Sequence, residues 1–229
     1  LRPLLRSGRR FFFFHPRFSD MELNPLTALS PIDGRYARQT DALRDIFSEC
    51  AFMNARVRVE VEWLISLSEA GFAELPHLSD HGKAFLRGLA DNFSLADCEA
   101  IKEIEKTTNH DVKAVEYWIK NQVAHDEELK SASEFVHFSC TSEDINNTSH
   151  AIMLKRGREA LADYLQQIHD TIAGFAHQWA EIPMLSRTHG QTASPTTVGK
   201  EFANVAVRLE RVIEAIRAVK IYAKMNGAV

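Results

Sequence analysis

The chain has 229 residues, which is long enough for one large domain or two modest ones. Hydrophobic residues make up 45% and charged residues 25% of it, as in an ordinary soluble globular protein. The formal net charge of −4 gives no broad positive field, so we expect no nucleic-acid partner. No apolar run reaches the roughly 18 residues that span a bilayer, so we expect no membrane partner.

The three cysteines, Cys50, Cys98 and Cys140, are scattered along the chain. They are too few for a disulfide framework or a zinc site, so we expect reduced thiols in a cytoplasmic protein. The histidines form no His-Glu-x-x-His helix, and we expect neither a metal nor a cofactor.

The first twenty residues differ in composition from the rest. They carry five arginines, a run from Phe11 to Phe14, and no acid before Asp20. An organelle-targeting segment is Arg-rich and acid-poor in this way. The alternative is upstream sequence ahead of a true start at Met21, because the Phe run spoils the amphipathic spacing of a targeting segment. In either case we expect residues 1–20 to be a disordered extension outside the fold.

Apolar residues then recur at helical spacing through the first half of the chain. This pattern predicts helices over residues 41–69, 79–92, 94–106 and 112–123. Gly71 and Pro76 mark the turn after the first of them. Ser94 to Asp97 forms a capping box that opens the third.

Two long helices are predicted in the second half. A capping box from Thr141 to Asp144 opens one that runs to about Trp179, and Ser194-Pro195 is a cap and first-turn pair for the next. No period-two alternation of strand length stands outside a helical pattern, so we expect an all-α fold. Two long helices joined by a loop of about fifteen residues favour an antiparallel bundle.

We expect a small helical domain over residues 21–130 and the first part of a helical bundle domain over 131–229. The chain ends as its last helix breaks, so we expect the natural chain to continue.

Polar clusters interrupt the helices at three places, where scaffolds usually hold chemistry. The first cluster covers residues 107–111. One interpretation is that it is simply a helix cap, with Asn109 or Asp111 accepting hydrogen bonds from free N–H groups. The alternative is that His110, the Thr hydroxyls and free N–H groups bind an anion or a carboxamide.

The second cluster covers residues 140–147, where capping alone explains Thr141 and Asp144. The same helix end can bind a carboxylate or phosphate, with Ser142 donating a hydrogen bond, and both interpretations can hold together. Cys140 is a poor candidate nucleophile, because neighbouring acids oppose its ionisation.

The third cluster, residues 186–191, places His189 between Thr188 and Gly190 on a connector. Histidine is the side chain best suited to proton transfer near neutral pH. Gly190 lets the backbone approach a ligand closely.

These clusters, together with two further motifs, closely resemble adenylosuccinate lyase of the bacterial type. The resemblance covers residues 21–229 in order, and its motifs are Ser30–Tyr36, Thr107–Tyr117, Ser139–Asn147, Ser186–Gln191 and Pro195–Glu201. Argininosuccinate lyases, fumarases and aspartases are related, and the Thr-Asn-His-Asp-Val segment favours the purine enzyme among them. One departure is Thr192, where a proline is usual. The resemblance implies a fumarase/aspartase-like helical fold.

The same resemblance implies cleavage of adenylosuccinate to AMP and fumarate, and of the succinylated imidazole-carboxamide ribotide to its carboxamide and fumarate. Both reactions are β-eliminations. They need a proton acceptor, a proton donor at the departing nitrogen, and positive or N–H groups around two carboxylates and a phosphate.

The resemblance also assigns roles to residues of this chain. His189 resembles the general acid, and His110 a second histidine that positions the substrate and supports charge. The substrate contacts that it implies are Arg35 and Tyr36 at the phosphate and nucleotide, Asn109 and Asp111 beside His110, and Thr141 and Ser142 at the succinyl carboxylates.

The family's general base is a serine in a Ser-Ser-x-Met-Pro-x-Lys-x-Asn motif that these residues do not contain. Its active sites are shared between the subunits of a homotetramer. We therefore expect the 229-residue chain to be inactive alone. Two alternatives are another lyase of the superfamily, such as argininosuccinate lyase, and a non-catalytic helical assembly protein.

Overall fold

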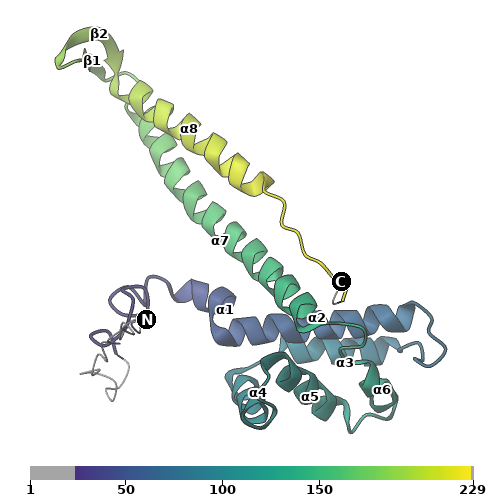
Figure 1. Cartoon of the computed structure of the whole chain (residues 1–229). Helices are drawn as coiled ribbons and strands as arrows, with labels where there is room; N and C mark the ends of the chain where they lie inside the picture. Colours follow the sequence, from purple (N-terminus) through teal and green to yellow (C-terminus); the bar gives the residue numbers. More distant parts are fainter. Residues whose placement is uncertain (1–23, 228–229) are drawn as a thin grey trace, which may run out of the picture. The chain divides into compact units, whose positions relative to one another are not determined.

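The computed structural model describes residues 24–227, so the expected extension over residues 1–20 lies outside the described residues. The chain divides into two compact units, whose described parts are residues 24–42 and 43–227. The second unit carries most of the regular structure and is mainly helical (Figure 1). Within the described part of the chain, no helix is both long enough and apolar enough to cross a membrane.

Helices of very different lengths follow one another along the chain, and a pair of strands precedes the last of them. In chain order the elements are η1 (Asp41–Leu43), α1 (Arg44–Phe47), α2 (Glu49–Glu69), α3 (Asp80–Asp91), α4 (Leu95–Thr108), α5 (Asp111–Val123), α6 (Glu127–Ala132), η2 (Ser133–Phe135), α7 (Ser142–Gln178), β1 (Pro183–Thr188), β2 (Gln191–Thr197) and α8 (Val198–Ala218).

The main hydrophobic core surrounds α2, whose side chains Val57, Val61 and Leu64 are buried among residues of α3 to α6. The predicted helix over 41–69 is interrupted at Ser48. The backbone of Ser48 is extended, and its hydroxyl accepts a hydrogen bond from the Ala51 N–H at 3.1 Å. A new helix therefore starts there, because the serine caps free N–H groups.

The predicted capping boxes at Ser94 and Thr141 are both confirmed. In each box the acid three residues later accepts a hydrogen bond from the cap residue's backbone N–H, at 2.8 Å in both cases. α6 and η2 were not predicted, since they are too short to show a helical period.

α8 packs along the C-terminal part of α7, and the chain after α8 runs back toward the N-terminal end of α7 (Figure 1). The helices approach closely at Gly199, where an added Cβ would lie 2.4 Å from the Ala176 carbonyl oxygen. Only glycine permits this contact. The Gly199 N–H also donates to the Trp179 carbonyl at 2.9 Å, which fastens the start of α8 to the end of α7.

The predicted helical fold is confirmed, but the connector between the long helices is a β-hairpin and not the expected loop. β1 and β2 pair antiparallel, and Ser194-Pro195 lies within β2 rather than at a helix start. Thr197 is the actual cap of α8, accepting from the Lys200 N–H at 3.2 Å. The sequence shows no alternation here because both faces of the hairpin are largely exposed, so neither face needs apolar residues.

The expectation of three reduced thiols was wrong for two of them. Cys50 at the start of α2 and Cys98 in α4 form a disulfide, with their Cα atoms 5.7 Å apart. The two cysteines are 48 residues apart in sequence, so no local pattern predicts their contact. It forms because α2 and α4 pack together. Cys140 is a free thiol.

This disulfide should be recovered by peptide mapping without reductant. Cys50→Ser should lower the free energy of unfolding by about 4 kcal/mol, because the bond closes a long loop in the unfolded chain. Denaturant titration measures the change, with Cys140→Ser as the matched control that leaves the bond intact. Alkylation of all three cysteines without reductant would contradict the assignment.

Candidate active site

The starts of α5 and α7 meet, and this contact joins two of the three polar clusters. His110 is the N-cap of α5, and Ser142 is the first residue of α7. The His110 Nε2 and Ser142 Oγ atoms are 3.3 Å apart, although 32 residues separate them in sequence. The structure therefore brings together the residues that sequence analysis assigned to two separate helix ends.

One hydrogen bond assigns the proton on His110. The Lys113 backbone N–H donates to His110 Nδ1 at 3.2 Å, so Nδ1 carries the lone pair. In the neutral ring the proton is then on Nε2, the atom that faces Ser142. The cap therefore fixes the tautomer of His110 that presents Nε2–H as a donor.

Two helix N-termini converge at this point. Each presents the positive end of a helix dipole, which favours an anion. In α5 the N–H groups of Val112 and Lys113 are already bonded to Asp111 and His110. The hydroxyl and the N–H of Thr141 both donate to Asp144, at 3.0 and 2.8 Å. Ser142 is thus better placed than Thr141 to donate a hydrogen bond to a ligand's carboxylate.

Asp111 is held by a buried arginine of α2. Arg56 is 3% exposed, forms an ion pair with Asp111, and donates from Nε to Asn146 Oδ1 at 2.9 Å. Its guanidinium also lies 3.9 Å from the centre of the Phe52 ring, a cation–π contact. One cation therefore fastens α2 to the starts of both α5 and α7.

The electrostatics keep Asp111 ionised. Burial alone would raise the pKa of this carboxyl, but the Val112 N–H and the Arg56 charge outweigh it and hold the pKa below its usual value. The neighbouring Asn109 is exposed and has a left-handed backbone with φ 50°, which ends α4 so that His110 can begin α5.

Sequence analysis missed a second histidine in this region. His137, just before the start of α7, has its Nδ1 atom 2.6 Å from Oε1 of the buried Glu60. The Glu60 hydrogen bond raises the pKa of His137. The detectable signal was Glu60 itself, since a charge among the apolar positions of α2 requires a buried partner.

Cys140 lies beside this pair as a half-buried thiol. Burial, together with the charges of Glu60 and Asp144, raises its pKa to about 12. A thiol with that pKa is not a nucleophile at neutral pH, in agreement with the expectation from the sequence.

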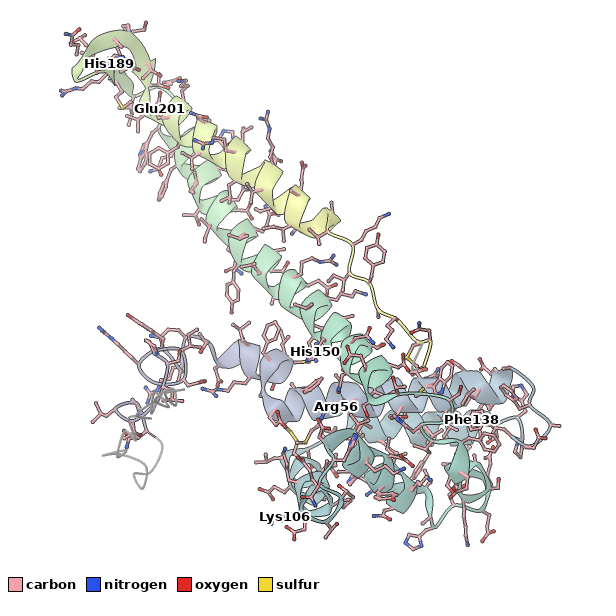
Figure 2. All side chains as sticks on the ribbon, viewed as in Figure 1. Arg56, Lys106, Phe138, His150, His189 and Glu201 are labelled. Carbon is pink, nitrogen blue, oxygen red and sulfur yellow. A yellow bond between two sulfur atoms is a disulfide. The ribbon has the colours of Figure 1, made fainter. Side chains whose placement is uncertain are left out.

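His189 lies at the other end of α7, at the tip of the hairpin (Figure 2). His189 and Gly190 have φ values of 50° and 74°, the pattern of a two-residue type I′ turn. Among the described residues, the His189 ring has no hydrogen-bond partner, and the side chain is exposed. A helix of 37 residues is about 55 Å long, so His189 and His110 of one chain cannot share a site.

Arg35 and Tyr36 belong to the first compact unit, residues 24–42. The Arg35 guanidinium lies 5.4 Å from the centre of the Tyr36 ring, a cation–π contact within that unit. Both side chains are exposed, so both are open to a ligand.

The Glu60–His137 pair predicts a pH-dependent stability. The pKa of His137 is raised in the fold, so its contribution is complete below the unfolded value of 6.5 and is lost as the pH rises through the folded value. His137→Gln should lower the free energy of unfolding by about 3 kcal/mol at pH 6, as expected when a buried pair loses one partner, and by less at pH 9. Denaturant titrations at both pH values measure this, with the exposed His125→Gln as control. An equal loss at both pH values would contradict the pairing.

Comparison with known proteins places these features in a family. The chain is 54% identical to adenylosuccinate lyase of Vibrio cholerae and 53% identical to that of Haemophilus influenzae, in each case over 91% of the chain. It spans about half of these relatives, 46% of their length. The β-carboxy-cis,cis-muconate cycloisomerase of Acinetobacter calcoaceticus shares the fold, with a TM-score of 0.63 at 21% identity over 82% of this chain and 43% of that one. Residues 34–229 match the family described as lyase, and the chain belongs to that family.

Proposed function

We propose that the whole protein is an adenylosuccinate lyase of purine biosynthesis. It releases fumarate from adenylosuccinate, giving AMP, and from the succinylated imidazole-carboxamide ribotide. The observation that carries this proposal is the His110–Ser142 contact at two converging helix N-termini, in a chain 54% identical to an adenylosuccinate lyase. We further propose that it acts in the cytoplasm on this small-molecule substrate, without a metal or cofactor.

In this proposal the α5–α7 junction binds the succinyl part of the substrate. The Ser142 hydroxyl and the helix N–H groups donate to a carboxylate, and His110 Nε2–H supports the charge that develops as the C–N bond breaks. Asn109 and Asp111 flank His110, and Arg35 and Tyr36 contact the phosphate and nucleotide.

His189 is the proposed general acid, and it reaches the junction from another copy of the chain. The exposed ring at the hairpin tip is free to give a proton to the departing nitrogen. Because α7 separates the two histidines of one copy, a complete site needs at least two copies.

The surface of α7 supports such an assembly. Large apolar side chains at helical spacing along it are exposed, with Leu154 at 56% and Leu161 at 51%. Tyr164 and Ile168 continue the same pattern, each 50% exposed. An apolar stripe of this kind is normally covered by another helix, and we propose a homotetramer whose bundle covers it.

The decisive experiment mixes two inactive variants of the whole protein. His189→Ala and His110→Ala should each reduce kcat for adenylosuccinate by at least about 100-fold, the usual effect of losing acid catalysis. Co-expression of the two should restore roughly a quarter of the wild-type rate, because random pairing of copies gives some sites both histidines. Fumarate release is the measurement.

Three results would contradict this proposal. Wild-type turnover of argininosuccinate in place of adenylosuccinate would show a different lyase, and no nucleotide binding at all would indicate an assembly protein. A mixture that stays inactive would show that both histidines act within one copy. His125→Ala, at an exposed histidine remote from either cluster in sequence, is the matched control.

A further inference from the structure

Asp144, on the first turn of α7, has a buried carboxylate with an unusual number of donors. The residue is 1% exposed. Its Oδ1 atom accepts from Lys224 Nζ at 2.8 Å and from the Asn226 N–H at 3.1 Å. Its Oδ2 atom accepts from the Thr141 N–H and hydroxyl and from the Gly227 N–H, at 2.8, 3.0 and 3.1 Å. The carboxylate therefore joins the start of α7 to the segment after α8.

A second set of bonds holds the backbone of Lys224 independently of its side chain. The Lys224 N–H donates to Asn147 Oδ1 at 2.8 Å, and Asn147 Nδ2 donates to the Lys224 carbonyl at 3.1 Å. The Thr148 hydroxyl also donates to that carbonyl, at 3.4 Å. Loss of the Lys224 ammonium would thus leave the segment attached to α7.

The charge of Asp144 matters because of its position. It lies two residues after Ser142, at the helix end where an anionic substrate is proposed to bind. An uncompensated carboxylate there would cancel the positive potential of the helix N-terminus and repel an anionic substrate. The Lys224 ammonium is the cation bonded to this carboxylate, and Arg56 on the neighbouring helix is committed to Asp111 instead.

We propose that Lys224 is a positioning residue for substrate recognition, cancelling the charge of Asp144 so that this buried carboxylate does not repel the substrate carboxylate that approaches Ser142 and His110. Lys224 acts through Asp144 and the helix end, and it does not touch the substrate. The proposal rests on the proposed lyase function.

The direction of the Asp144 pKa agrees with an ionised partner for Lys224. Burial alone would raise the pKa of this carboxyl, but the Lys224 ammonium and the N–H groups of Thr141 and Asn226 outweigh it and hold the pKa well below its usual value. Asp144 is therefore charged at every pH at which the enzyme would be assayed.

The test is a charge series in the whole protein. Lys224→Met should raise the KM for adenylosuccinate about tenfold at low ionic strength, with kcat within about twofold of wild type. The increase should shrink at high salt, because screening weakens the repulsion. Lys224→Arg should restore the KM, and so should the double variant Lys224→Met with Asp144→Asn, which removes both charges.

The matched control is Lys220→Met, which removes an exposed lysine four residues earlier on the same segment. Its KM should equal that of wild type. An unchanged KM in Lys224→Met, a change that salt does not reduce, or an equal change in Lys220→Met would overturn the proposal. Absence of wild-type turnover would instead overturn the lyase function, and this inference with it, before any variant is compared.

Discussion

The unbroken length of α7 is the constraint on which the rest of the arrangement depends. Its N-terminal end carries Ser142 against His110, and its C-terminal end carries the hairpin with His189. A straight helix of this length cannot bring its own two ends together. A reaction that needs both His110 and His189 must therefore use the two side chains from separate copies of the chain. The exposed apolar stripe on the same helix is consistent with this, because association of copies would bury it.

At the N-terminal end, acidic groups are committed to partners before a ligand arrives. Asp111 is paired with Arg56, Glu60 with His137, and Asp144 with Lys224. Each pair also joins segments that are distant in sequence, so charge compensation and tertiary structure are provided by the same contacts. The donors left available at this junction include the Ser142 hydroxyl and His110 Nε2–H.

The capping residues at this junction show why structural and catalytic interpretations need not compete. His110 caps α5 through Nδ1, and the same bond leaves the proton on Nε2. Thr141 caps α7, and its donors are used in doing so. Membership of the lyase family agrees with a site built from such helix ends, while 46% coverage of the relatives means that the chain holds only part of what they contain.

The sequence by itself determined the longer helices, the two capping boxes and the family, because these depend on local periodicity and on motifs of adjacent residues. It also predicted which clusters carry chemistry, and those roles stay predictions. The domain boundary near residue 130 stays a prediction. Only the tertiary structure decided the Cys50–Cys98 bond, the His110–Ser142 contact and the Asp144–Lys224 pair, since each joins residues at least 32 positions apart. The hairpin around His189 could also be recognised only in the structure. An exposed two-stranded ribbon buries neither face, so its sequence does not alternate between apolar and polar residues.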